Sequence, residues 1–189
     1  GLKRLEQAGL VSIHQGGATS VLDFRKTAGL EILGAMIVGP RGRINTDIVR
    51  SVTDLRTNLA LQLSERAASH CTSADTDALM EVVTKMRAHA GDIEALQELA
   101  MTYWGLVVGA SRSLPYQLAY NSMDAVYGRI QSQLSHVLSD EVSAVDLYEQ
   151  LAKALIQSDS TAAQKYAAQI VSLGSKAIES ILVDLERVQ

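Results

Sequence analysis

The sequence contains little of what secreted proteins and membrane proteins require. It has one cysteine, Cys71, in 189 residues, which excludes a disulfide framework within the chain and is typical of a reducing cytosol. No apolar run approaches the roughly 20 residues of a membrane-spanning helix. No basic segment followed by an apolar one resembles a secretory leader. We therefore expect a cytoplasmic protein that is not attached to a membrane.

Residues arranged for catalysis or metal binding are equally scarce. The four histidines lie apart, without a pair at helical spacing, and neither a HExxH nor a CxxC pattern occurs. His70 and Cys71 are adjacent, so on a helix their side chains would point about 100° apart, and we expect an ordinary thiol. No glycine-rich phosphate loop is present. The sequence predicts that the protein is not an enzyme, and it implies no cofactor.

Charge is spread unevenly over the chain. The net charge is -4, yet residues 1–50 hold seven basic and four acidic side chains, and the remainder holds ten basic and seventeen acidic ones. A basic end on an acidic body is typical of a small nucleic-acid-binding module joined to another domain, although a solvated surface explains the same balance. Because the chain begins at Gly1 rather than at Met, we also expect a preceding segment that this sequence lacks.

The only β pattern lies near the start of the chain. Residues 2–8 predict the end of a helix, which Gly9 stops. Alternating residues 11–14, a glycine turn and residues 19–22 then predict a hairpin. From residue 24 onward the pattern is helical, beginning with a short amphipathic helix at 27–37 and a loop after Gly39.

The rest of the chain predicts a succession of amphipathic helices. Asn45 is expected to cap a long helix that the segment 71–75 interrupts. Further helices are predicted at 75–90, 92–111, 115–138, 139–155 and 160–187. With so little strand signal, the fold class is mainly α: an antiparallel helical bundle preceded by a helix end and a hairpin.

Four strings resemble one family of transcription regulators. LKRLEQAGLVSI with its glycine turn resembles the recognition-helix end and wing of a GntR-type winged helix-turn-helix. DFRKTAGLEIL resembles the linker of the FadR subfamily, and DLRTNLALQL and AVYGRI resemble helices of the FCD, or FadR C-terminal, domain. The resemblance implies a truncated DNA-binding domain at 1–23, a linker at 24–44, and a helical effector-binding and dimerisation domain at 45–189.

The resemblance also implies a function and partners. It implies a homodimeric regulator that binds operator DNA through the complete N-terminal domain, with Lys3, Arg4, His14 and Gln15 near the DNA. Lys3 and Arg4 would lie at the exit of the recognition helix and touch phosphate rather than bases. Because the first part of the reading head is missing, we expect this chain alone to bind DNA weakly.

Many FCD domains hold a metal with one Asp and three His, and this sequence departs from that pattern. The positions of the four ligands carry Met101, Gly105, Tyr148 and Ile170, none of which is a usual transition-metal ligand. The resemblance therefore implies the metal-free FadR branch, whose cavity takes an acyl-coenzyme A.

The candidate effector-binding residues follow from that resemblance and from the apolar stripe that precedes Arg56. Arg56 is the best polar anchor for a carboxylate, thioester or phosphate, with a surface salt bridge as the alternative. The full set is Arg56, Met101, Gly105, Tyr120, Tyr127, Arg129, Tyr148, Ile170 and Gly174. Two other functions stay open: a regulator that senses a different organic acid without metal, and a helical interaction module that does not bind DNA.

Overall fold

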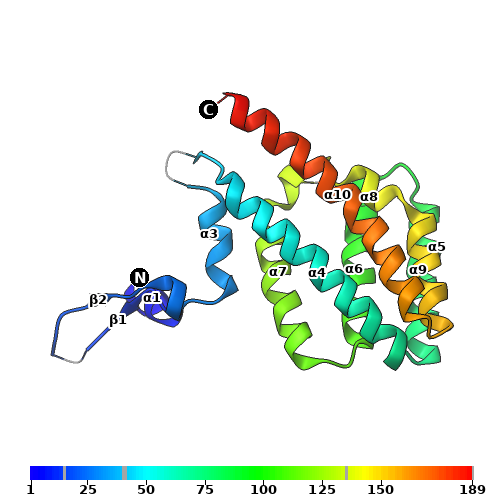
Figure 1. Ribbon diagram of the computed structural model, residues 1–189, viewed down its shortest axis with the longest axis horizontal. Coiled ribbons are helices and arrows are strands. Elements are labelled where there is room, and N and C mark those ends of the chain that lie inside the picture. The colour runs from blue at the N-terminus through cyan, green and yellow to red at the C-terminus, as the bar shows by residue number, and fades with distance from the viewer. Residues whose placement is uncertain (15, 40–41, 135, 189) are drawn as a thin grey trace.

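The protein folds into a helical bundle with a small hairpin unit that stands away from it (Figure 1). The structure is a computed structural model, and it describes residues 1–14, 16–39, 42–134 and 136–188; the side chains of 127–134 and 188 lie outside that description. The mainly helical fold class predicted from the sequence is confirmed.

The hairpin unit contains one short helix and two short strands. Helix α1 (Leu2–Gln7) ends before Gly9, and strand β1 (Val11–Ser12) pairs antiparallel with β2 (Ser20–Val21). Gly9 has a φ of +66°, and a Cβ there would collide with the carbonyl of Thr27. This position therefore requires glycine, both to end the helix and to let the following segment pack closely.

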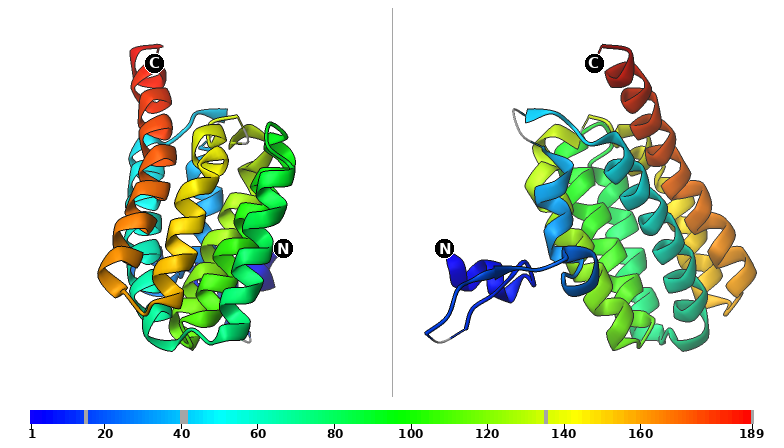
Figure 2. Two further views of the ribbon diagram at one scale, coloured as in Figure 1. Left: turned by 90° about the vertical axis from the view of Figure 1, so that its right-hand side faces the viewer. Right: turned by 60° about the vertical axis from the view of Figure 1, so that its left-hand side comes forward.

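The segment that joins the hairpin unit to the bundle differs from its prediction. In place of one helix at 27–37, it forms α2 (Phe24–Thr27), a 3-10 turn η1 (Leu30–Ile32) and α3 (Leu33–Ile37). Ala28 and Gly29 are both extended, which separates α2 from η1. The Thr27 hydroxyl donates to the carbonyl of Gly9 at 2.6 Å, so α2 is attached to the hairpin unit, whereas α3 lies against the bundle (Figure 2).

Six long helices build the bundle. They are α4 (Thr46–His70), α5 (Ser73–Ala88), α6 (Ile93–Ala110), α7 (Leu114–Leu134), α9 (Val145–Ile156) and α10 (Ser160–Val188). Helices α4 and α10 run antiparallel along each other (Figure 1), with Arg50 bonded to Glu179 near one end and Gln164 bonded to Glu65 near the other.

Side-chain caps explain where several helices begin. The Asn45 Oδ1 accepts from the backbone N–H of Ile48 at 3.2 Å, as predicted for the start of α4. Thr72 and Asp75 form a capping box at the start of α5, and Asp92 caps α6. These side chains satisfy backbone donors that have no partner in the first helical turn.

The predicted helix at 139–155 is wrong in one respect that matters for the site. It is two helices, α8 (Ser139–Ser143) and α9, separated at Ala144, whose ψ of 49° is not helical. Helix α7 likewise ends at Leu134 rather than at 138. Short α8 therefore packs on α6 and α10 in its own direction and buries Glu141 and Val142.

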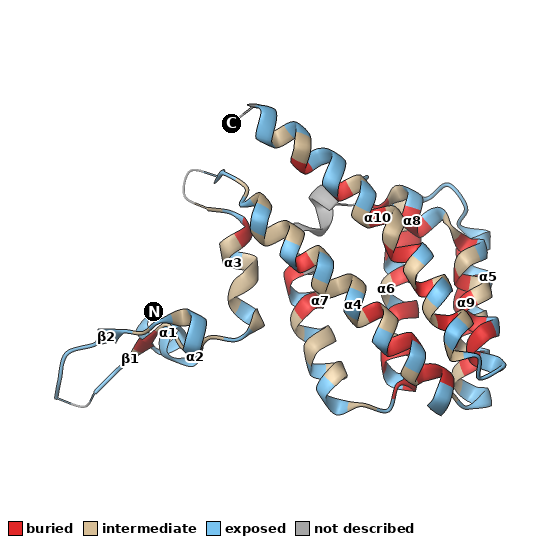
Figure 3. Cartoon of the chain, viewed as in Figure 1, coloured by how far each residue is buried: buried red, intermediate tan, exposed pale blue. Residues whose placement is uncertain are grey.

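The core runs through the middle of the bundle (Figure 3). Its largest fully buried side chains include Tyr103, Tyr148, Met86, Leu96 and Leu151. In the hairpin unit, by contrast, Val11 alone among the described residues is buried. Over the described residues, no helix has both the length and the apolar character needed to cross a membrane.

Candidate effector site

A cavity of about 100 Å³ opens between five helices of the bundle. Helices α4, α6, α7 and α10 and the segment around α8 all contribute side chains to its wall. The lining residues are Arg56, Leu59, Ala60, Leu63, Gln97, Ala100, Met101, Trp104, Tyr120, Met123, Asp124, Leu138, Glu141, Val142 and Val171. Most of this wall is apolar, so the cavity favours a ligand with an apolar body.

Arg56 and Glu141 form an ion pair in the wall of the cavity. Arg56 Nη2 donates to Glu141 Oε1, and the two side chains are 16% and 3% exposed. Arg56 lies on the face of α4 next to the buried stripe of Val52, Ala60 and Leu63, and α8 brings Glu141 to it. A buried carboxylate needs such a partner, because an unpaired charge in the interior is strongly destabilising.

Gly174 on α10 provides the space in which the Glu141 carboxylate lies. A Cβ at this position would stand 2.2 Å from Glu141 Oε2 and 2.7 Å from Leu138 Cδ2, so both side chains would have to shift to admit it. The helix backbone of α10 thus takes the place of a side chain against α8. Gly174 positions Glu141 and does not itself line the cavity.

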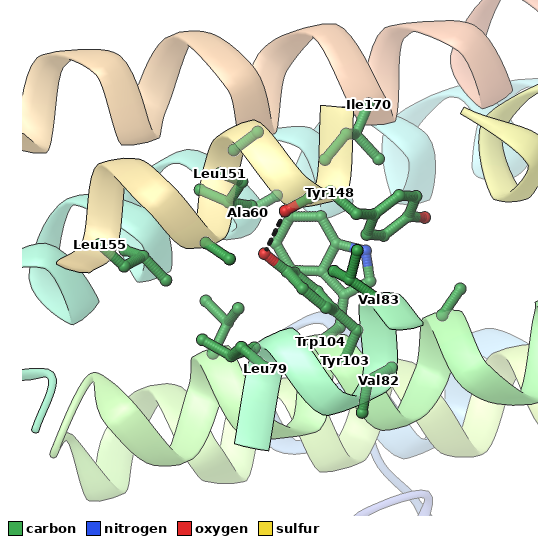
Figure 4. Packing of buried hydrophobic residues seen from close by; sticks show 14 of the residues in the cluster. Ala60, Leu79, Val82, Val83, Tyr103, Trp104, Tyr148, Leu151, Leu155 and Ile170 are labelled. Carbon is green, nitrogen blue, oxygen red and sulfur yellow. Dashed lines mark hydrogen bonds between the residues drawn. The ribbon is translucent and has the colours of Figure 1, made fainter. Parts of the chain in front are cut away.

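Three aromatic side chains gather beside the cavity, between α6 and α9 (Figure 4). The hydroxyl of Tyr103 donates to the carbonyl of Tyr148 at 2.8 Å, and the two rings meet edge to face with centroids 5.0 Å apart. Trp104 packs edge to face on Tyr103 and lines the cavity. Burial raises the pKa of Tyr148 far above its ordinary value, and Glu141 raises it further, while the charge of Arg56 and a hydrogen-bonding contact with Trp104 lower it.

The predicted effector residues fall into four groups. Arg56, Met101 and Tyr120 line the cavity. Among the other described ones, Tyr148 and Ile170 are fully buried in the core next to it, and Gly105 and Gly174 stand outside its wall. The side chains of Tyr127 and Arg129 lie outside the described residues. Arg56 is not the surface salt bridge considered as its alternative, because its partner Glu141 is buried.

Sequence reasoning missed Glu141, Trp104 and Asp124. Glu141 stands in the string SDEVS, which looks like the acidic first turn of an exposed helix. Its burial depends on the break at Ala144, for which the sequence holds no Gly or Pro. Trp104 is the single tryptophan of the chain, and this was the sequence feature that could have marked it as a candidate.

The structure offers no set of metal ligands at the positions that the resemblance implies. Met101 has a thioether, Gly105 and Ile170 have no donor, and Tyr148 keeps its proton because burial raises its pKa. Over the described part of the chain, no three His, Cys, Asp or Glu side chains gather closely enough to hold an ion. These residues do not fit a transition metal.

The residues predicted to lie near DNA belong to the hairpin unit. Lys3 and Arg4 are exposed on α1, His14 is exposed beside the turn, and Gln15 lies outside the described residues. Glu6 Oε1 accepts from the backbone N–H of Ile13 at 3.2 Å, which ties α1 to the end of β1. The basic side chains of α1 and the hairpin turn therefore belong to one small unit.

Comparison with known protein families and sequences finds transcription regulators. The FCD domain matches residues 51–172. An HTH-type transcriptional regulator of Mycobacterium bovis and the HTH-type transcriptional regulator Mce2R of Mycobacterium tuberculosis are each 29% identical to this chain over 182 residues. Each alignment covers 96% of this chain and 75% of the relative.

Comparison with solved structures finds the same architecture. A GntR protein of Streptococcus agalactiae superposes with a TM-score of 0.58 at 17% identity, over 93% of this chain and 78% of that one. The McbR/YncC protein of E. coli gives a TM-score of 0.63 at 18% identity, over 97% of this chain and 77% of that one. At these identities the similarity concerns the fold.

Proposed function

Since the chain belongs to the FCD domain family and is a transcription regulator of the GntR type, we propose that it couples DNA binding to an effector held in the bundle cavity. The observation that carries this proposal is the apolar cavity with its Arg56–Glu141 pair, in a bundle joined to a hairpin unit that exposes Lys3 and Arg4. We propose that the protein regulates transcription, that it catalyses no reaction, and that it acts in the cytoplasm.

We propose that residues 1–23 are the end of a winged helix-turn-helix, 24–44 the linker and 45–189 the effector domain. In that arrangement Lys3 and Arg4 contact phosphates, while His14 and Gln15 at the wing tip approach the minor groove. The exposed positions of Lys3, Arg4 and His14 support this role.

The linker is the proposed route between effector and DNA. Helix α2 is bonded to the hairpin unit through Thr27, and η1 and α3 pack on α7, which also lines the cavity. A ligand that shifts α7 would therefore change how the hairpin unit is held. Such coupling requires that the ligand bind two arrangements of the chain with different affinity.

The proposed effector is an acyl-CoA or a related lipid metabolite. The apolar wall supports an aliphatic body, since each buried CH₂ contributes about 0.8 kcal/mol. A cavity of about 100 Å³ is smaller than the one of about 150 Å³ that is known to hold benzene, so a long chain requires the helices to part. An organic acid bound without metal is the second candidate.

A panel of ligands tests the regulator proposal. Thermal stability of this chain, and operator affinity of the protein with its complete reading head, are measured with acyl-CoAs, free coenzyme A and short organic acids. We expect an acyl compound to raise the melting temperature and to change operator affinity at least tenfold. Arg56→Ala and the cavity-filling Ala100→Leu should both weaken that response. Stabilisation by a short dicarboxylate alone would favour the organic acid, and absence of DNA binding would favour an interaction module.

Metal content is predicted from the ligand positions. We expect elemental analysis to find less than about 0.1 transition metal per chain, and chelator treatment to leave the melting temperature unchanged. About one metal per chain, with loss of stability on chelation, would contradict the alignment that places Met101, Gly105, Tyr148 and Ile170 at the ligand positions.

A further inference from the structure

Three deeply buried polar atoms beside the cavity form no hydrogen bond of full geometry among the described residues, although Trp104 lies close enough to Tyr148 to interact with its hydroxyl. They are Nε1 of Trp104, the hydroxyl oxygen of Tyr148 and Oε2 of Glu141. The three residues are 8%, 0% and 2% exposed. Buried polar groups are nearly always hydrogen-bonded in proteins, so three of them at one place require an explanation.

The three residues lie close to one another beside the cavity. Trp104 and Glu141 both line it, and the Tyr148 ring stands beside Trp104 against Tyr103 (Figure 4). The Tyr148 hydroxyl is close enough to Glu141, Arg56 and Trp104 for all three to influence its pKa. Trp104, Glu141 and Tyr148 together offer an N–H donor, a carboxylate acceptor and a hydroxyl that can donate or accept a hydrogen bond.

The charges of the wall disfavour an anion beside these three residues. Among the described lining residues, two carboxylates, Asp124 and Glu141, accompany one cation, Arg56, and Glu141 already accepts a hydrogen bond from that guanidinium. A ligand carboxylate at Arg56 would compete with Glu141 for the guanidinium and would lie near two carboxylates, and this repulsion is costly. An uncharged head that forms hydrogen bonds meets no such cost.

We propose that the effector carries an uncharged polar head that both donates and accepts a hydrogen bond, a hydroxyl or a primary amide, bound between Trp104, Tyr148 and Glu141. The head donates to Glu141 Oε2 and accepts from the Trp104 N–H. Its apolar body lies along Leu59 and Met123. This inference rests on the proposed function in one respect only, that the cavity is the effector site.

A ligand series on one carbon skeleton tests the head group. Benzyl alcohol, benzamide, benzoate and toluene share one benzene ring, for which the cavity of about 100 Å³ has to widen slightly. Binding to this chain is measured by calorimetry without DNA. We expect benzyl alcohol and benzamide to bind at least tenfold more tightly than toluene or benzoate, which corresponds to about 1.4 kcal/mol. Equal binding of benzyl alcohol and toluene, or tightest binding of benzoate, would overturn the proposal.

Variants that each remove one polar atom test which residues cause the preference for benzyl alcohol over toluene. In Trp104→Phe, Tyr148→Phe and Glu141→Gln, the ratio of benzyl alcohol affinity to toluene affinity should fall at least threefold. The control is Tyr166→Phe, because Tyr166 lies outside the cavity wall, and this variant should retain the parent ratio. The Tyr148→Phe protein without ligand should melt close to the parent, since the hydroxyl that it loses forms no hydrogen bond of full geometry. An unchanged ratio in all three variants would overturn the assignment and indicate that ordered water alone satisfies these atoms.

These measurements separate the inference from the regulator proposal. If the alcohol shows no preference while another compound still changes operator affinity, the head-group assignment fails and the regulator stands. If the alcohol binds as expected but no ligand changes operator affinity, the assignment stands and the regulatory function fails.

Discussion

Gly174 illustrates, at the scale of a residue, how a missing side chain shapes the site. Its Cα faces the Glu141 carboxylate, and a Cβ there would overlap Oε2 and Leu138. We expect Gly174→Ala to lower the free energy of unfolding by about 1–3 kcal/mol, because a well-packed interior has to shift to admit an extra methyl group. Urea denaturation followed by circular dichroism measures this change.

Gly105 supplies the matched control for that prediction. It also stands within a helix, yet a Cβ there meets nothing within 4 Å. Gly105→Ala should therefore leave stability unchanged or raise it by up to about 1 kcal/mol, since alanine is the better helix former. Equal losses in the two variants would contradict the role assigned to Gly174.

Cys71 allows a prediction about pH. Burial and, to a smaller extent, Asp75 raise the pKa of its thiol to about 11, against a lowering effect of Arg112. Alkylation requires the thiolate, so at pH 8 the folded protein should react roughly two-hundredfold more slowly than the urea-unfolded chain, whose thiol has a pKa of about 8.5. The rate in the folded protein should rise as the pH approaches 11. Timed iodoacetamide labelling read by mass spectrometry measures both rates, and equal rates at pH 8 would contradict the prediction.

At the scale of an element, the start of α4 determines where the linker ends and the bundle begins. The Asn45 side chain accepts from Ile48, and Asn45 itself donates its N–H to the carbonyl of Ile37 at 2.9 Å. The cap therefore also fixes the end of α3 against α4. Helix α8 is the opposite case, because it has no side-chain cap and packing on its neighbours holds it in place.

Loss of the α4 cap should be measurable. We expect Asn45→Ala to lower the free energy of unfolding by about 1 kcal/mol and Asn45→Asp to retain the parent value, since aspartate caps equally well. Asn58→Ala is the control, because Asn58 is exposed in the middle of the same helix. Because alanine is the better helix former, Asn58→Ala should not lower stability, and a loss equal to that of Asn45→Ala would contradict the capping role.

At the scale of the whole molecule, assembly is the main expectation. A regulator with one reading head per chain usually pairs, so that two heads match two half-sites on DNA. We predict a homodimer for the protein with its complete N-terminal domain. Light scattering at micromolar concentration should give twice the chain mass, and a monomer mass there would contradict the prediction.

The amino-acid sequence by itself determined the parts of this protein that depend on neighbours in the chain. The long helices with their Asn45 cap, the Gly9 stop and the hairpin follow from periodicity and turn chemistry within a few residues. Arg56 and Met101 were identified as candidates because they lie next to apolar stripes and in familiar strings, and both line the cavity.

Only the tertiary structure decided which groups meet inside the bundle. Glu141 is 85 positions from Arg56, and a single break at Ala144 directs it into the interior and not toward solvent. The polar site beside the cavity combines Trp104 of α6, Glu141 of α8 and the neighbouring Tyr148 of α9, which no local pattern relates. Side chains from separate helices become neighbours only through packing, and packing also determines whether an acidic residue at a helix start is exposed or buried.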